Sequence, residues 1–226
     1  MFINGNRFIQ HCIYIRREQK WAQENRKSLI EGHSAGFKAI KEVIKHASNN
    51  NLVDSFILYA FSTENWNSKN RVIFMRLFKK VLSEELNEMI NNNLRLKHIG
   101  RKDRISKDLL ELINYAESES KNNSGIIVYL GIDYGGKDEI VRAVNKIPQG
   151  EAIHEETISK YMDIPTEHTP QILIRTSNEK RLSNFLLWHL QYTELFFIDK
   201  FLPNFTSKDL DLILDDYKSR NRRFGK

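Results

Sequence analysis

The sequence predicts an α/β fold, a single domain with a mainly parallel central sheet flanked by helices. Short apolar runs rich in β-branched and aromatic residues alternate with longer segments of helical period, and this alternation is typical of parallel sheets. The chain has no internal repeat, low-complexity tract or linker-like segment. At 226 residues it is long enough to bury a sizeable core, so residues 1–226 are expected to form one domain.

Six short apolar runs are predicted to be strands, at 12–16, 56–61, 94–99, 126–132, 171–174 and 195–198. The clearest helix spans 74–90, where apolar residues recur at intervals of three and four. This stripe is expected to pack the core. A second helix covers 37–44, and the last begins at a capping box formed by Thr206 and Asp209.

Composition narrows the partners and the compartment. The formal net charge of +6 and the pI of about 9.3 favour anionic partners. The basic residues are scattered, and no basic helix with interleaved aromatic residues is present, which argues against nucleic acid. Cys12 is the single cysteine, as expected in a reducing compartment. No apolar run is long enough to span a bilayer or to form a secretory leader, so a cytoplasmic location is expected.

The densest polar stretch spans 174–188, directly after a predicted strand. It carries Arg175 and Arg181, six residues apart, and Ser183 with Asn184 at the predicted start of an apolar helix. Guanidinium groups, a hydroxyl and the N-terminus of a helix are groups that bind a diphosphate. The alternative is a surface loop with an ordinary serine cap.

Four other blocks also place polar or small residues beside predicted strands and helices. Each has a simpler structural explanation: a satisfied turn, a packed histidine, a glycine turn or a carboxylate at a strand start. The blocks are 62–67, with Asn65 and Trp66; 32–36, with His33 between two glycines; 133–136, which ends in two glycines; and 192–197, with Glu194.

In order and spacing, the five blocks resemble the cis-prenyltransferase family, whose type member is undecaprenyl diphosphate synthase. The family motif F-S-x-E-N-W matches 61–66, G-H-x-x-G matches 32–36 and Y-G-G matches 134–136. R-T-G-G-E-x-R-x-S-N-F-L-L-W matches 175–188 apart from Ser177 and Asn178, where the family has glycines. Y-x-E-L-x-F matches 192–197 and R-R-F-G matches 222–225. The resemblance covers nearly the whole chain.

The resemblance implies condensation of isopentenyl diphosphate with an allylic diphosphate, with Mg²⁺ helping to neutralise the phosphates. It also implies that the apolar stripe at 74–90 lines a hydrophobic tunnel. It assigns the isopentenyl diphosphate to Arg175, Arg181 and Ser183, and adds Trp66 to the substrate-binding residues. His33 and Asn65 would lie beside the reacting groups. Glu194 would bear on the metal across a dimer contact.

One block departs from the family pattern, H-x-A-x-I-M-D-G-N-x-R-W-A. The corresponding segment runs from His11 to Ala22 and is one residue shorter. The metal-binding aspartate of the family therefore falls on Arg16 or Arg17, depending on the end from which the block is aligned. Two alternatives remain: Glu18 could take the ligand role, or the loop could lie at 4–7, where the aspartate is also missing.

Two family arginines for the allylic diphosphate also fall on other residues, Leu29 and Ser68. The departures all concern one pocket, whereas the isopentenyl residues are retained. Arg16 and Arg17 could neutralise a diphosphate directly, so the need for Mg²⁺ is open.

Three hypotheses follow. The first is a divergent prenyltransferase with a rebuilt allylic pocket. The second is an inactive subunit that pairs with a complete homologue, and the third is a protein that only binds isoprenoid diphosphates. The expected partners are an isoprenoid diphosphate, a second subunit in a homodimer or heterodimer, and membrane lipid in a peripheral contact.

Overall fold

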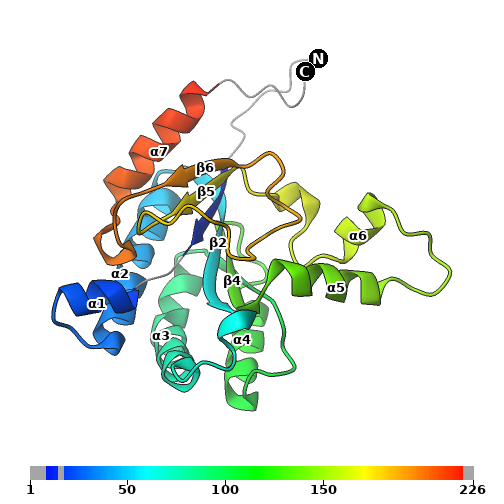
Figure 1. Cartoon of the computed structure of the whole chain (residues 1–226), viewed down its shortest axis with the longest axis horizontal. Coiled ribbons are helices and arrows are strands. Elements are labelled where there is room, and N and C mark those ends of the chain that lie inside the picture. Colours follow the sequence, from blue (N-terminus) through cyan, green and yellow to red (C-terminus); the bar gives the residue numbers. More distant parts are fainter. Residues whose placement is uncertain (1–8, 15–17, 221–226) are drawn as a thin grey trace.

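The computed structural model describes residues 9–14 and 18–220. Within this part, six strands form one sheet in the order β3-β4-β2-β1-β5-β6, and every pairing between them is parallel (Figure 1). The strands are β1 (Ile9–Tyr14), β2 (Val53–Ser62), β3 (Arg95–Ile99), β4 (Ile127–Tyr134), β5 (Ile172–Arg175) and β6 (Glu194–Phe197). The predicted α/β class is confirmed, and each of the six expected strands is present.

The described helices are α1 (Glu18–Glu24), α2 (Leu29–Asn49), α3 (Arg71–Asn91), α4 (Lys107–Glu119), α5 (Gly136–Lys146), α6 (Glu155–Tyr161) and α7 (Ser207–Ser219), of which α7 follows the last strand. Short 3-10 turns are η1 (Thr63–Asn65), η2 (Thr166–His168) and η3 (Leu202–Asn204). The capping box of Thr206 and Asp209 opens α7 as predicted, and a second one, of Ser28 and Glu31, opens α2. These side chains bond the N–H groups that a helix start leaves without partners.

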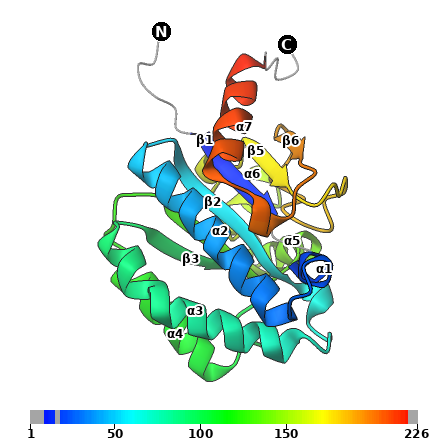
Figure 2. The same cartoon turned by 90° about the vertical axis from the view of Figure 1, so that its left-hand side faces the viewer.

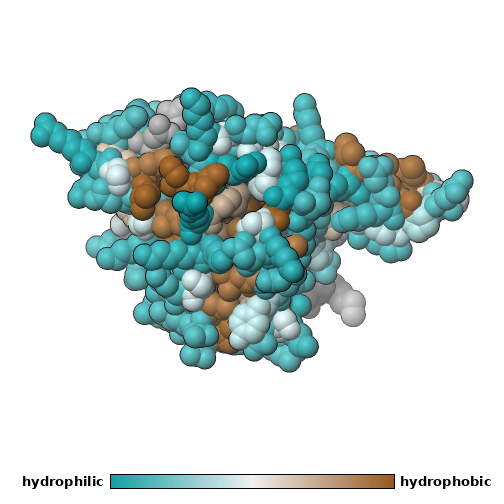
Figure 3. Space-filling model, turned by 90° about the horizontal axis from the view of Figure 1, so that it is seen from below, coloured by the Kyte–Doolittle hydropathy of each residue, from teal (hydrophilic) through white to brown (hydrophobic). Residues whose placement is uncertain are grey.

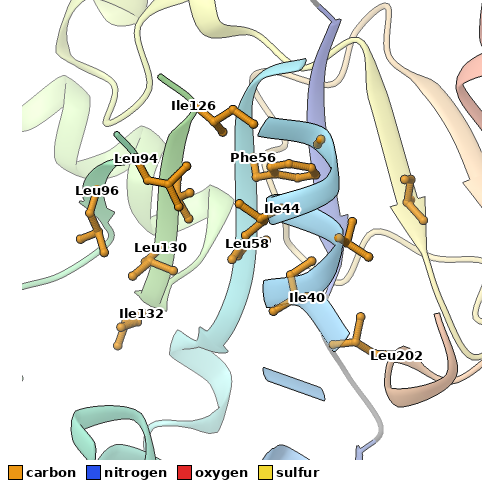
Figure 4. Close-up of a cluster of buried hydrophobic side chains, with 14 of the residues drawn as sticks. Ile40, Ile44, Phe56, Leu58, Leu94, Leu96, Ile126, Leu130, Ile132 and Leu202 are labelled. Carbon is orange, nitrogen blue, oxygen red and sulfur yellow. The ribbon is translucent and has the colours of Figure 1, made fainter. Parts of the chain in front are cut away.

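Each face of the sheet has its own apolar core. Along β2, Phe56 and Leu58 point to the face covered by α2 and α3, whereas Ile57 and Tyr59 belong to the core on the opposite face. This follows from the alternation of side chains along a strand. Figure 2 shows α2 and α3 lying along the first face, and Figure 4 shows the side chains of α2 meeting those of the strands.

A cavity of about 800 Å³ lies between α2, α3 and the sheet. Its lining is largely apolar and includes Phe37, Leu58, Phe78, Val81, Leu96 and Leu130. The stripe predicted for 74–90 does both things expected of it. Phe74 and Leu86 pack in the core, while Val81 and Met89 line the cavity. Figure 3 shows apolar groups surfacing among hydrophilic ones on the side of the molecule seen from below.

One predicted helix is absent. The segment that follows Ser183 forms successive turns in the described structure, not the apolar helix expected there. Ser183, Asn184 and Leu186 have positive φ values of 49°, 61° and 48°. A right-handed helix cannot contain such residues. The apolar residues after Ser183 suggested a helix, but Phe185 and Leu186 instead enter the core beside Tyr59 and Tyr134.

No described helix combines the length and the apolar character needed to cross a membrane.

Candidate active site

Because all six strands run parallel, their carboxyl ends meet at one edge of the sheet, where α/β proteins bind ligands. Three of the motif blocks leave strands at this edge. η1 follows β2, the glycine pair follows β4, and the loop from Thr176 follows β5. His33 reaches the same region from the first turns of α2. The candidate site is therefore built from segments far apart in the sequence.

Arg175 is the centre of the site. It is the last residue of β5 and is only 2% exposed. Its Nη2 donates a hydrogen bond to Oγ of Ser183, at 3.2 Å. A buried guanidinium needs polar partners, and its planar fork suits a diphosphate. The structure thus brings together two of the three residues expected to hold isopentenyl diphosphate.

The backbone between them has two consecutive residues in the left-handed region, although neither is a glycine. Ser177 and Asn178 have φ values of 70° and 52°, in the left-handed region that glycine adopts easily. Their N–H groups donate to the carbonyls of Lys200 and Ile198, at 2.7 and 3.0 Å. These two bonds hold the loop against the segment after β6, so it keeps its course despite the unfavourable residue types.

Arg181, the third expected residue, lies at the surface of the loop. Its guanidinium forms an ion pair with Glu179, and more than half of its side chain is exposed. The two arginines therefore differ in environment: Arg175 is fixed inside the protein, whereas Arg181 has the freedom of an exposed side chain.

Asn184 ties the loop to the two neighbouring blocks. Its carbonyl accepts from the N–H of Gly136 at 2.6 Å, and its Oδ1 accepts from the N–H of Lys137 at 2.9 Å. Its Nδ2 donates to Oε1 of Glu64, in η1, at 2.5 Å. The residue was predicted only as part of a helix start. Its signal in the sequence was its place in a matching block.

Gly135 makes this junction close enough. A Cβ on Gly135 would lie 2.4 Å from Oγ1 of Thr63 and 2.8 Å from Nδ2 of Asn184. Neither distance is tolerated by a real carbon atom. A glycine is needed here for the close contact and not for its backbone conformation, because a φ of −158° is extended backbone that any residue can adopt.

Asn65 ends η1 and is half-buried, and Trp66 follows it. Trp66 is 8% exposed. The guanidinium groups of Arg71 and Arg104 lie 5.1 and 4.8 Å from the centre of its ring, and Arg71 also bonds its carbonyl at 3.1 Å. These contacts fix the indole as the support of the turn that presents Asn65.

His33 lies between α1 and α3. Its ring meets the ring of Phe74 edge-on, with centroids 5.4 Å apart, and its Nδ1 lies 3.7 Å from Oε2 of Glu18. Burial lowers the pKa of His33, so the imidazole is neutral at pH 7. Phe74 stacks in turn on Phe61, the residue before Ser62. This contact places His33 one aromatic ring away from the end of β2.

Glu194 lies away from this group. It begins β6 and pairs in register with Ile172, at the opposite end of β5 from Arg175. Its Oε2 accepts a bond of 2.7 Å from Arg220, near the end of α7. Within one chain, the structure therefore does not bring Glu194 to the other expected site residues.

Within residues 9–14 and 18–220, no group of three or more His, Cys, Asp or Glu side chains lies together to hold a metal ion. Mg²⁺ is usually bound by one or two carboxylates together with substrate phosphates and water, so an ion here would take part of its ligands from the diphosphates. Arg16, Arg17 and the rival loop at 4–7 lie outside the described residues.

Comparison with known proteins decides the family. Residues 18–225 match the sequence profile of the family described as putative undecaprenyl diphosphate synthase. The chain belongs to the cis-prenyltransferase family. Its chemistry is therefore that of a prenyltransferase, and the resemblance read from the motif blocks is confirmed. The match starts at Glu18, after Arg16 and Arg17, so it does not cover the position at which the aspartate is replaced.

Similar cis-prenyltransferases cover the chain almost completely. The isoprenyl transferase of Wolinella succinogenes is 40% identical over 210 residues, which cover 91% of each chain. That of Aquifex aeolicus is 37% identical over 211 residues, or 92% of this chain and 91% of its own. The crystal structure of lavandulyl diphosphate synthase from Lavandula x intermedia, in complex with dimethylallyl diphosphate, superposes with a TM-score of 0.89 at 33% identity. The match covers 96% of this chain and 97% of that one.

Proposed function

We propose that the protein condenses isopentenyl diphosphate with an allylic diphosphate, and that Arg175 and Ser183 hold the isopentenyl diphosphate. The observation that carries this proposal is the buried guanidinium of Arg175 at the carboxyl end of β5, bonded to Oγ of Ser183. A scaffold has no need for a cation at that depth. A diphosphate there would gain charge-assisted hydrogen bonds in surroundings of low dielectric constant.

The reaction needs few groups from the protein. The bond between C1 and the diphosphate oxygen of the allylic substrate breaks, C1 bonds to C4 of isopentenyl diphosphate, and a proton leaves C2. Arg175 and Ser183 orient the acceptor, and the exposed Arg181 closes over its diphosphate. A neutral His33, with its pKa lowered by burial, is in the form that accepts a proton. Asn65 offers an amide beside the leaving group.

The cavity between α2 and α3 takes the hydrocarbon chain. Its lining is apolar, so each added isoprene unit leaves water for an apolar surface. Ile30 and Ile73, at the starts of α2 and α3, are exposed residues of the cavity wall. We place the peripheral contact with membrane lipid at this end of the cavity.

The allylic pocket is proposed to use cations in place of the missing aspartate. Arg16 and Arg17 occupy that part of the sequence, and a guanidinium can neutralise a diphosphate as a metal does. Because the described residues hold no cluster of three or more His, Cys, Asp or Glu side chains, Mg²⁺ at this site would depend on phosphate oxygens of the substrates for part of its coordination. Glu194 could contribute to a metal only in an assembly of two subunits.

The second candidate function is that of an inactive subunit in a heterodimer. Strand β6 lies at the edge of the sheet. Leu195, within this strand, is 40% exposed, and Tyr192, just before it, is 62% exposed. Exposed aromatic and aliphatic groups at a sheet edge favour a protein partner. A homodimer serves the first candidate function equally well. Sedimentation of the purified protein at micromolar concentration tests for it, and a monomer would argue for the heterodimer.

Activity separates the two functions. Purified protein is incubated with radiolabelled isopentenyl diphosphate and allylic diphosphates of 5, 10 and 15 carbons, with Mg²⁺ and with EDTA. We expect a butanol-extractable product from at least one allylic substrate, and none from Arg175→Met. Absence of product under every condition, from a folded protein, would favour the inactive subunit.

A further inference from the structure

Glu18 is a buried acid that none of the assigned roles uses. It is the first residue of α1 and is 5% exposed. Its carboxylate turns toward α2, where Oε2 lies 3.7 Å from Nδ1 of His33. A carboxylate this close to an imidazole favours the orientation in which a ring N–H faces it and stabilises a positive charge that forms on the ring. The sequence suggested Glu18 as a substitute metal ligand, and the structure places its carboxylate beside the histidine.

The two glycines of the G-H-x-x-G block make room for this acid. A Cβ on Gly32 would lie 2.6 Å from the carbonyl oxygen of Glu18. A Cβ on Gly36, one turn later, would lie 3.1 Å from its Cγ and 3.4 Å from its Oε1. Gly32 therefore accepts the backbone of Glu18 and Gly36 accepts its side chain. In this chain the block's glycines and its histidine all face the same residue.

The ring of His33 is held from two sides. Phe74 of α3 meets it at 5.4 Å with an interplanar angle of 80°, and Glu18 of α1 faces Nδ1. Among the described residues, Glu18 is the charged group that lies against this ring. The other ring nitrogen, Nε2, makes no hydrogen bond within that part of the chain. One nitrogen is thus directed to the acid, and the other is left to a ligand.

We infer that Glu18 is a positioning residue for His33. Its carboxylate sets the tautomer of the His33 ring and balances the positive charge that forms when the ring is protonated. With the proton on Nδ1 facing the carboxylate, the lone pair on Nε2 is available. When Nε2 takes a proton, the nearby carboxylate stabilises the imidazolium. An acid that orients a base in this way is a recurrent arrangement in catalysis.

The catalytic part of this inference rests on the proposed function. In that reaction the proton on C2 of isopentenyl diphosphate passes to Nε2. The π electrons between C3 and C4 form the bond to C1 of the allylic substrate, and the electrons of the C–H bond form the new double bond between C2 and C3. The diphosphate group of the allylic substrate leaves with the electrons of its C–O bond. The tautomer of His33 is a property of the protein without substrate, so it can be measured whether or not the protein is active.

The test compares Glu18→Gln with the unaltered protein. Glutamine keeps the size and shape of the side chain and removes its charge. We expect kcat to fall about 10- to 100-fold. This is less than the roughly 100- to 10,000-fold that a general base itself contributes, because Glu18 acts only through His33. KM for isopentenyl diphosphate should change less than about twofold, because Arg175 and Ser183, and not Glu18, are proposed to bind this substrate. Glu18→Asp, which keeps the charge, should recover part of kcat. Glu24→Gln, on the exposed side of α1, is the matched control and should leave kcat unchanged.

The second readout is the ¹⁵N chemical shifts of the His33 ring at pH 8. We expect the Nδ1–H tautomer in the unaltered protein and a mixture in Glu18→Gln. Unchanged kcat and an unchanged tautomer in Glu18→Gln would reduce Glu18 to packing and overturn the inference. If that variant does not fold, an Nε2–H tautomer in the unaltered protein overturns it and an Nδ1–H tautomer supports it. Should the protein make no product at all, the same spectra still decide, so failure of the proposed function is distinguishable.

Discussion

Single residues show which parts of the site the sequence could reveal. Arg175, Ser183 and His33 were identified by their place in motif blocks, and the structure puts the first two in contact. Glu18 could not be recognised in the same way. Its role depends on α1 packing against Gly32 and Gly36, a tertiary contact without a local pattern in the sequence. Motifs identify the residue types, whereas packing decides which of them meet.

The contact between Ser183 and Arg175 gives a prediction at this scale. Ser183→Ala removes the hydroxyl that accepts from Nη2. Hydrogen bonds to charged groups contribute about 1.5–3 kcal/mol, so KM for isopentenyl diphosphate should rise about tenfold or more. Steady-state kinetics with varied isopentenyl diphosphate measure this. Ser219→Ala, whose hydroxyl bonds only the end of α7, is the control. Equal KM values in the two variants would contradict the assignment.

At the scale of elements, strands and caps were predictable and irregular segments were not. β6 and the capping box of Thr206 follow from local sequence. The first strand begins at Ile9 and not at 12, because pairing with β2 and β5 extends it beyond its most apolar residues. The turns at Ser183 and Asn184 were missed because an apolar run cannot distinguish a helix from a buried chain of turns.

The junction of three blocks at Gly135 gives the second prediction. Gly135→Ala places a methyl group 2.4 Å from Oγ1 of Thr63. Overpacking of this kind costs about 1–3 kcal/mol, so the free energy of unfolding should fall by that amount. Thr63→Ala in the same chain removes the nearest clash and should recover part of the loss. Urea denaturation of the two single variants and the double variant checks this. Strictly additive effects would mean that the two residues do not meet.

The pairing of β3 with β4 gives a prediction on pH. His98 is buried on β3, and its Nε2 bonds the carbonyl of Ile132 at 3.0 Å. Burial lowers the pKa of His98 from 6.5 to about 4. Between these values the unfolded chain binds more protons than the folded one, so the free energy of unfolding falls as the pH drops. The contribution of the neutral, buried His98 to the free energy of unfolding is fully present above about pH 6.5. Its loss by pH 4 is on the order of 3 kcal/mol.

His98→Gln should flatten this part of the stability profile. Chemical denaturation at intervals from pH 7 to pH 4 measures the slope for both proteins. His154→Gln, on an exposed side chain, serves as the control. The same slope in His98→Gln and in the unaltered protein would contradict the assignment of this pH dependence to His98.

The whole molecule combines one apolar cavity with one polar edge of the sheet. The cavity lies under α2 and α3, and the motif blocks gather where the strands end. The sequence predicted the α/β class and the apolar stripe that lines the cavity. The volume of the cavity could not be predicted, because it depends on how far α2 and α3 stand from the sheet. The prediction that the single domain includes the two ends of the chain, within residues 1–226, stays a prediction.

Cavity volume leads to a prediction about the product. Ala60 of β2 lines the cavity, and Ala60→Leu adds three carbons there. The product should become shorter by at least one isoprene unit, while the rate of the first condensation stays within about twofold, because the reacting groups are untouched. Mass spectrometry of extracted products measures the chain length. Ala152→Leu, on an exposed loop, is the matched control. A full-length product from Ala60→Leu would exclude this cavity as the site of the chain.

The central claim is that Arg175 and Ser183 hold one diphosphate while arginines replace the missing acid at the other. A crystal structure with isopentenyl diphosphate and an allylic thio-diphosphate tests it most directly. We predict the isopentenyl diphosphate on the guanidinium of Arg175 and the hydroxyl of Ser183, with Arg16 or Arg17 on the allylic diphosphate. Magnesium held by the carboxylate of Glu18, with both arginines turned away, would contradict the claim.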